Sequence, residues 1–174
     1  DGDTTGTVGW AFDSGTEAFN FLAEGETLEL TYTVEVEDSQ AATDTQDVVI
    51  TITGTNDDPV ITSVAAEVTK DLTETTDDTG LTSSGSFAVE DVDTSDVVTA
   101  SIVGEPSIDL SETTVLPTGL NATVLAGFFT LDDTASIADG DTTCTVGWAV
   151  DSGTESFNFL AEGVTLDLTY TVVV

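Results

Sequence analysis

An internal repeat is the sequence feature that most limits what this chain can fold into. Residues 1–36 recur as residues 139–174 without a gap, an offset of 138 residues, and six of the 36 aligned positions differ. This period is too long for one unit of a solenoid but matches the size of a whole domain. We therefore predict tandem domains of one kind, with residues 1–57 as the C-terminal part of one repeat and residues 58–174 as the following repeat.

The pattern of apolar residues predicts an all-β fold. Apolar and polar side chains alternate over residues 28–36, which is typical of a half-buried strand. Clusters of Gly, Asp, Asn and Ser separate this run from other short β-rich runs, and no helical periodicity stands out. About seven or eight strands per repeat favour an immunoglobulin-like (cadherin-like) β-sandwich, with Trp10 and Trp148 in its core. The other predicted strands cover residues 8–12, 19–21, 48–52, 60–64, 86–92, 97–103 and 127–131.

The chain is strongly acidic. It contains 34 Asp and Glu residues against a single basic residue, Lys70, and no histidine, so its formal net charge is −33. Because 39% of the residues are hydrophobic, an acidic disordered tail is not expected. One cation cannot neutralise a phosphate backbone or hold the chain on an anionic membrane, which excludes nucleic acid and membrane surfaces as partners. No apolar run approaches the ~18 residues of a transmembrane helix, and we predict no direct membrane insertion.

The sequence lacks the residues on which most catalytic centres depend. Without histidine there is no Ser/His/Asp or Cys/His system, and no glycine motif for phosphate or dinucleotide binding occurs. Cys144 is the single cysteine and its counterpart is Gly6, so no disulfide forms within a repeat. Zinc and copper are not expected without histidines or paired cysteines. We predict that the chain is not an enzyme, although its many acidic residues leave an accidental carboxylate pair of the glycosidase kind open.

Three stretches of sequence form longer motifs: residues 19–34 (FNFLAEGETLELTYTV), residues 42–57 (ATDTQDVVITITGTND) and residues 89–96 (VEDVDTSD). In the same order, they resemble three features of VCBS-type repeats: the signature F-x-[YF]-L-A-x-G-E-T-L-x-L-T-Y-T-V, the last strand and the D-V-D-x-x-D loop. Repeats of this type recur in large bacterial RTX and biofilm-associated surface adhesins. The resemblance implies extender domains of a long extracellular adhesin on the bacterial cell surface, exported by type I secretion and bound to calcium. Residues 67–80 are longer and more acidic than the family's VTED segment, whose glutamate is matched best by Glu74.

Two groups of oxygen-bearing side chains are predicted to meet at one pole of the second repeat. The turn at residues 91–96 carries three carboxylates, and residues 56–58 come just before the first strand. Calcium takes six to eight oxygen ligands in irregular geometry, so we predict a calcium (Ca²⁺) site in the linker, completed by a loop of the preceding repeat. The D-G-D turn at residues 139–141, also present at residues 1–3, is a second candidate. The predicted ligands are Asn56, Asp57, Asp58, Asp91, Asp93, Asp96, Glu24, Glu74, Asp139 and Asp141.

Two other functions stay open at this point: a module that binds a glycan or a surface, and a strand-exchanging subunit of an extracellular fibre. The counterpart of residues 48–54 would lie beyond Val174, so the second repeat is predicted to lack its last strand. That strand should begin near the pole at which the strand before it ends. Because an open edge exposes unpaired backbone groups, we predict that a neighbouring repeat or a neighbouring chain fills it by strand complementation.

Overall fold

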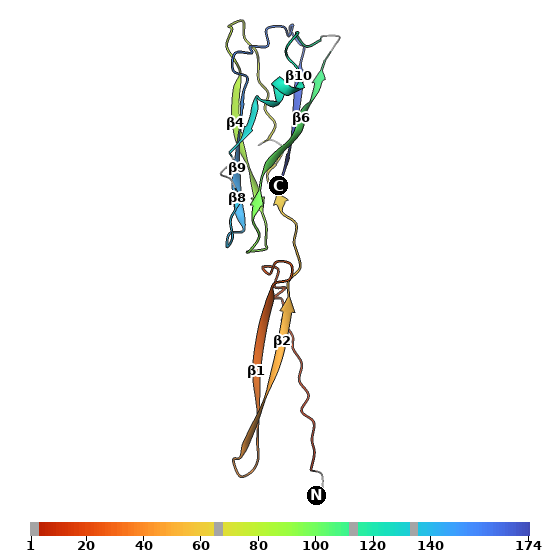
Figure 1. Cartoon of the computed structure of the whole chain (residues 1–174), viewed down its shortest axis with the longest axis vertical. Coiled ribbons are helices and arrows are strands. Elements are labelled where there is room, and N and C mark those ends of the chain that lie inside the picture. Colours follow the sequence, from red (N-terminus) through yellow and green to blue (C-terminus); the bar gives the residue numbers. More distant parts are fainter. Residues whose placement is uncertain (1–3, 65–67, 112–114, 133–135) are drawn as a thin grey trace.

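The computed structural model describes residues 4–64, 68–111, 115–132 and 136–174. These residues form mostly strands in several antiparallel sheets, with very little helix, so the all-β prediction is confirmed. The molecule is elongated, with a hairpin at one end and the remaining strands at the other (Figure 1). The chain passes between the two parts at residues 54–59.

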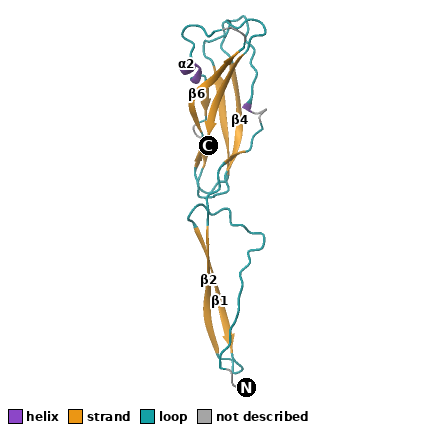
Figure 2. Cartoon of the chain, turned by 90° about the vertical axis from the view of Figure 1, so that its right-hand side faces the viewer, coloured by secondary structure: helices purple, strands orange, loops and turns teal. Residues whose placement is uncertain are grey.

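The N-terminal part is a two-stranded hairpin. β1 (Thr27–Glu37) and β2 (Thr43–Thr53) pair antiparallel, with Tyr32 opposite Val48. The period-two pattern of the sequence therefore gives strands here, as predicted. Residues 4–18 run beside the hairpin without joining it as a strand (Figures 1 and 2).

Two predicted strands of the N-terminal part are wrong. Residues 8–12 have no strand partner, and residues 19–21 form a turn in which Phe19 has a φ angle of 60°. A strand needs a neighbour because its backbone N–H and C=O groups are paired across the ladder. The counterpart of residues 8–12 has such a neighbour and lies within β9 (Thr143–Asp151).

Two main sheets make up the C-terminal part (Figure 2). In the first, four strands lie in the order β3-β4-β9-β7, and in the second, β10 pairs with β6. A short pair of strands, β5 and β8, lies near the end that faces the hairpin. The bounds are β3 (Val60–Ile61), β4 (Thr82–Glu90), β5 (Val98–Thr99), β6 (Ser101–Leu110), α2 (Ala122–Ala126), β7 (Phe129–Leu131), β8 (Ser136–Ile137), β9 (Thr143–Asp151) and β10 (Leu166–Val173).

Several predicted strands keep their place but change length. The predicted runs at residues 86–92 and 127–131 overlap β4 and β7. The run at residues 60–64 contracts to β3, and the run at residues 97–103 divides into β5 and the beginning of β6. The reason is that hydrophobic alternation marks where a strand can form, whereas its length depends on which neighbour is there to pair with it.

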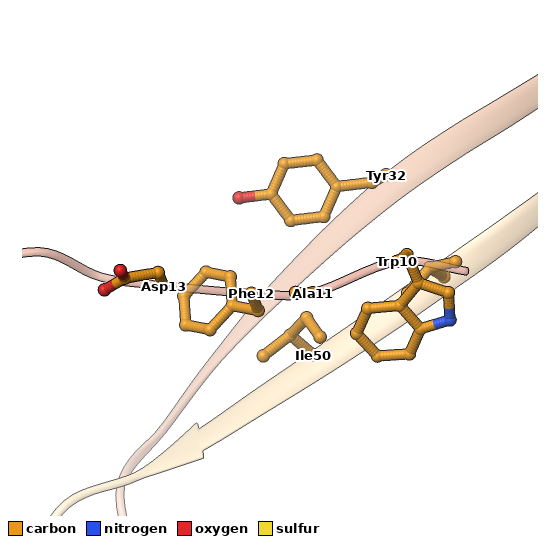
Figure 3. A pocket seen from close by; sticks show the side chains of 7 residues that line it. Trp10, Ala11, Phe12, Asp13, Tyr32 and Ile50 are labelled. Atoms are coloured by element: carbon orange, nitrogen blue, oxygen red, sulfur yellow. The ribbon is translucent and has the colours of Figure 1, made fainter.

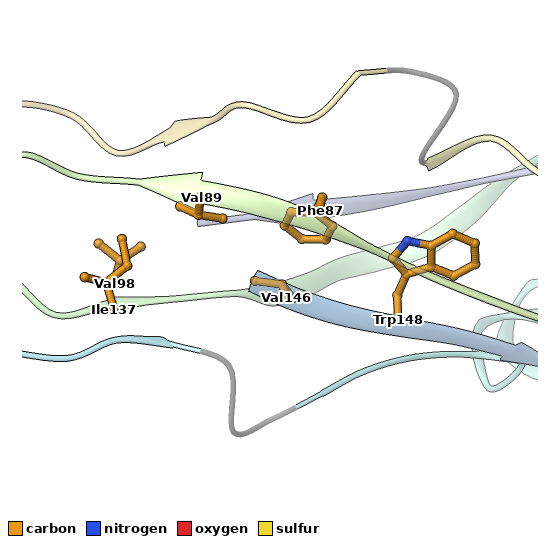
Figure 4. Packing of buried hydrophobic residues seen from close by; sticks show 6 residues of the cluster. All are labelled: Phe87, Val89, Val98, Ile137, Val146 and Trp148. Carbon is orange, nitrogen blue, oxygen red and sulfur yellow. The ribbon is translucent and has the colours of Figure 1, made fainter. Parts of the chain in front are cut away.

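The core lies between the two main sheets. Figure 4 shows Phe87 and Val89 of β4 and Val146 and Trp148 of β9 packed with Val98 and Ile137 of the short pair. β10 joins them through Tyr170, whose ring stacks on Phe129 with centroids 4.7 Å apart. A second cluster around Leu125 and Phe157 fills the other half of the part. Burying each large side chain contributes about 1.5–3 kcal/mol, which makes these clusters the main source of stability.

The two copies of the repeat differ sharply in burial. Trp148 is 7% exposed, and its counterpart Trp10 is 62% exposed. Val146 is 1% exposed, and its counterpart Val8 is 68% exposed. The prediction that both tryptophans fill a core is thus confirmed for Trp148 and wrong for Trp10, because the described residues of the N-terminal part form no strands equivalent to β4 and β7 that would cover Trp10.

Candidate metal centre

Two carboxylates are buried in the turn that follows β4. Asp91 and Asp93 are 3% and 0% exposed. The backbone N–H of Asp93 donates to Oδ1 of Asp91 at 3.1 Å, and the N–H of Asp96 donates to the backbone oxygen of Asp93 at 3.2 Å. On the other side, the N–H of Asp91 donates to the backbone oxygen of Thr142 at 2.9 Å. The sequence DVDTSD therefore folds into a compact turn fixed to the strand beside it.

Asp93 carries the most informative atom of the site. Its Oδ2 accepts a 2.7 Å hydrogen bond from the N–H of Asp57, in the segment between the two parts. Its Oδ1 is buried and has no hydrogen-bond partner among the described residues. An unsatisfied buried acceptor costs about 1–3 kcal/mol, and more when it is charged. A cation at this position would remove that cost.

Two further carboxylates belong to the same site. Burial, followed by the carboxylates of Asp93, Asp91 and Glu26, raises the pKa of Asp96 above its ordinary value. Glu26 lies in the turn just before β1, so it comes from the N-terminal part. Four acidic side chains from both parts of the molecule thus share one strongly negative region.

Hydrogen bonds hold the turn against the end of the hairpin. The N–H and the hydroxyl of Thr94 both donate to the backbone oxygen of Phe21, at 3.3 and 3.0 Å. Within the hairpin end, Oε2 of Glu26 accepts the N–H of Ala23 at 3.0 Å. Gly54 passes so close that an added Cβ would lie 2.4 Å from the backbone oxygen of Ala23. Any larger residue at position 54 would therefore push this turn away.

The predicted ligands before β3 reach the site to different degrees. Asp57 is half-buried and binds Asp93 through its backbone N–H. Asn56 and Asp58 are exposed, and the Asn56 amide donates to Oδ1 of Asp58 at 3.4 Å. The structure therefore brings residues 56–58 and the DVDTSD turn together, with Asp57 in direct contact.

The D-G-D turn lies at the same pole. The N–H of Gly140 donates to the backbone oxygen of Thr94 at 2.6 Å. The two flanking residues, Asp139 and Asp141, are both exposed, and no hydrogen bond connects their carboxylates with the buried pair in the described part of the chain. The first copy of this motif, at residues 1–3, lies outside the described residues.

Glu24 and Glu74 occupy different surroundings. Glu24 is exposed in the turn of residues 22–26, and the carboxylate of that turn that acts on Asp96 is Glu26. Sequence reasoning missed Glu26, although it is one of the six positions at which the copies differ, with Val164 as its counterpart.

The segment that contains Glu74 is directed away from the joint. Glu74 itself is half-buried. Four residues before it along the chain, Nζ of Lys70 lies 6.0 Å from the Trp148 ring centroid. Four residues after it, Oδ1 of Asp78 accepts a hydrogen bond from the Asn158 amide at 2.9 Å. Asn158 follows the end of β9 opposite to the DVDTSD turn. The contacts of this segment therefore lie along and beyond the body of the C-terminal part.

The donor set at the joint fits a hard divalent cation. All of its side-chain donors are carboxylate oxygens, which calcium prefers, and calcium also accepts backbone oxygens and water in irregular geometry. Among the described residues, no three acidic side chains already meet at one point in the manner of a formed metal site. Binding would accordingly require the carboxylates of Asp91, Asp93, Asp96 and Glu26 to turn toward a common centre.

Comparison with protein-family models, curated proteins and solved structures gave no match to this chain. Within the described part of the chain, no helix is long and apolar enough to cross a membrane. Cys144 is half-buried in β9, and burial raises the pKa of its thiol, which disfavours a reactive thiolate.

Proposed function

We propose that this chain is a calcium-stabilised extender segment of a long extracellular bacterial adhesin, with a structural rather than a catalytic role. Its task would be to give reach and rigidity for attachment to cells or for biofilm formation. The observation that carries the proposal is the buried, unpartnered Oδ1 of Asp93 at the joint between the two parts. The elongated shape of the molecule also supports it (Figure 1).

The strand order supports an immunoglobulin-like sandwich. The order β3-β4-β9-β7 corresponds to the A-B-E-D sheet of a constant-type immunoglobulin domain, and β6-β10 corresponds to strands C and F of the other sheet. The chain order of these six strands is also that of A to F. By the repeat, β1 and β2 would be strands F and G of a preceding domain of the same kind, which supports a tandem arrangement.

A calcium ion at this joint would act as a clamp between neighbouring domains. Asp91, Asp93 and Asp96 belong to one side of the joint and Glu26 to the other. A bound cation would attract all four carboxylates, whereas without it they repel one another across the joint. Lys70 is the one basic residue of the chain, so salt bridges cannot take over this neutralisation.

A glycan-binding or surface-binding module is the second candidate, because the hairpin carries exposed aromatic residues. Figure 3 shows Trp10, Phe12 and Tyr32 around an open hollow beside Ile50, with the Asp13 carboxylate close by. Residues 8–12 are, however, the counterparts of a stretch of β9 that fills the core. The hollow is therefore better explained as one half of an unclosed core, and we favour the extender.

The test is a calcium titration followed by thermal unfolding. We expect millimolar calcium to raise the melting temperature, with a Kd on the order of 10⁻⁴–10⁻³ M, as in extracellular modules. At 100 times Kd, the stabilisation would be about 2.7 kcal/mol per site. Asp93→Asn should weaken binding by about tenfold or more, because it removes the charge of the buried ligand.

Asp13→Asn is the matched control for this experiment. Asp13 lies in an exposed turn, where its Oδ1 accepts the N–H of Gly15 at 2.8 Å, and an asparagine can keep that hydrogen bond. Its response to calcium should equal that of the unmodified chain. Identical melting curves in EDTA and in millimolar calcium would refute the calcium site, as would equal responses of the two variants.

A further inference from the structure

β10 leaves one of its two edges open. Among the described residues, it pairs with β6 on one side and with no strand on the other. Such an edge exposes a row of backbone N–H and C=O groups that can template another strand. In the immunoglobulin-like order of the proposed function, on which this inference rests, strand G would lie at this edge.

The internal repeat identifies the strand that fits there. Residues 28–34 of β1 and residues 166–172 of β10 have the same sequence except for Glu29, which is replaced by Asp167. β1 pairs with β2 over eleven opposed positions. β10 has almost the same sequence as β1. The pairing of β1 with β2 therefore shows how β2 would pair with the open edge of β10.

The register places the apolar face of β2 toward the core. Transferred from β1 to β10, it sets Ile52 opposite Leu166, Ile50 opposite Leu168 and Val48 opposite Tyr170. Directly opposed residues of an antiparallel pair lie on the same face. Leu166 and Leu168 pack on the cluster around Leu125, and Tyr170 stacks on Phe129. The three added side chains would therefore extend the existing core.

The charges of the two strands are compatible in this register. The net charge of −33 opposes association in general. However, Asp167 would lie opposite Thr51, and Asp47 would lie opposite Thr171. In the hairpin, Oγ1 of Thr33 donates to Oδ1 of Asp47 at 2.7 Å, and Thr171 is the counterpart of Thr33. No carboxylate of β2 would directly oppose a carboxylate of β10.

We infer that the open edge of β10 accepts β2 of a second copy of this chain, antiparallel and in the β1–β2 register. β2 can be exchanged because an isolated two-stranded hairpin is marginally stable in water, and the aromatic face of this one is exposed. β10 ends near the joint (Figure 1), so the donated strand begins there and ends at the far pole. The C-terminal part of the donor then continues from that pole. Each copy donates one strand and accepts one, and the contact leads to head-to-tail chains rather than closed dimers.

The experiment compares the mass in solution of the unmodified chain with that of two variants of β2. Ile50→Asp places a charge on the face that enters the core, and Val49→Asp places the same charge on the adjacent residue, which is 51% exposed on the other face. Light scattering is recorded over a wide range of concentration, in calcium and in EDTA. We expect the unmodified chain and Val49→Asp to grow beyond twice the 17.9 kDa monomer, and Ile50→Asp to stay monomeric.

A peptide of residues 43–54 tests the acceptor edge by itself. It should bind the Ile50→Asp chain with a one-to-one stoichiometry, protect the amides of β10 from hydrogen exchange, and reduce the mass of the unmodified chain. A peptide with the same residues in shuffled order should have none of these three effects. A monomeric unmodified chain at every concentration, equal assembly of the two variants, or a peptide that does not bind would overturn the inference. None of these outcomes alters the calcium dependence of melting. The experiments can therefore reject strand exchange and leave the calcium site standing, or the reverse.

Discussion

Glu26 connects the acidic cluster to the N-terminal part of the molecule. Its carboxylate is one of the charges that raise the pKa of Asp96. The same position in the second copy is Val164, so a joint built with that copy would have one carboxylate fewer. Calcium affinity depends on the number of charged ligands. We therefore expect successive joints of an array to differ in calcium affinity.

Glu26→Gln tests this role with little change in shape. Glutamine can still accept the N–H of Ala23 through its amide oxygen, but it removes the charge. We expect calcium to bind about tenfold more weakly, as measured by isothermal titration calorimetry, because one anionic ligand is lost. Glu24→Gln, an equal change at an exposed position of the same turn, should leave the affinity unchanged. Equal effects of the two substitutions would show that the turn contributes only general negative charge.

The sequence grouped three of the predicted calcium ligands in one turn but missed the nearby carboxylate of Glu26. Asp91, Asp93 and Asp96 share a turn of six residues, so any fold of that turn keeps their carboxylates near one another. Glu24 and Glu26 are both carboxylates of one turn, and which of them acts on Asp96 depends on how the turn of residues 22–26 is oriented. Only the packing of that turn on Thr94 settles this.

At the level of elements, the same sequence forms a strand in one copy and no strand in the other. The Val-Gly-Trp stretch lies inside β9 in the second copy, between β4 and β7, and lies on the surface without a strand partner in the first copy. The difference is that, within residues 4–59, no strands equivalent to β4 and β7 are present. A strand of this composition is thus stable only when neighbours pair with its backbone and cover its apolar face.

The same substitution made in each copy measures how much burial by the neighbouring strands contributes to the free energy of unfolding. Val146→Ala should lower the free energy of unfolding by about 1–3 kcal/mol, because it removes two buried methyl groups and leaves a cavity. Val8→Ala, the same change in the other copy, should stay within about 0.5 kcal/mol, because Val8 is already exposed. Urea denaturation followed by fluorescence provides both values. Equal losses of stability in the two variants would contradict the difference in burial between Val146 and Val8.

At the level of the whole molecule, repulsion between like charges opposes the compact state. Thirty-four acidic residues face a single lysine, and the charges are spread along both parts. Self-repulsion of this kind destabilises a compact state unless ions screen it or bind to it. If calcium neutralises these charges, as proposed above, we expect the chain to stay loose where calcium is scarce and to fold where it is abundant.

Removal of calcium should therefore loosen the fold most at low ionic strength. We expect far-UV circular dichroism in EDTA and dilute buffer to show reduced β content. Raising the salt to about 0.15 M, which shortens the Debye length to about 8 Å, should restore part of it. Millimolar calcium should restore the rest and magnesium less, because magnesium demands a stricter geometry. A cooperative, fully native state in EDTA at low salt would count against this view.

The sequence by itself determined the local conformation of each turn. Gly15 and Gly153 have φ angles of 66° and 62°, and Phe19 and Phe157 have 60° and 59°, in copies with very different surroundings. The same local hydrogen bond forms in both copies, because the N–H of Gly15 and that of Gly153 each donate to Oδ1 of the aspartate two residues earlier. The period-two pattern likewise identified β1, and the β-rich runs at residues 48–52 and 86–92 marked β2 and β4 before any neighbour was known.

Only the tertiary structure decided which of these segments became paired strands, which side chains were buried and which carboxylates met at the joint. Trp10 and Trp148 lie in the same Thr-Val-Gly-Trp-Ala sequence, yet one is exposed and the other is in the core. The buried oxygen of Asp93 also depends on contacts with a segment 36 residues away. Turns are fixed by bonds between near neighbours, whereas burial and charge clustering depend on distant segments that the local sequence does not specify.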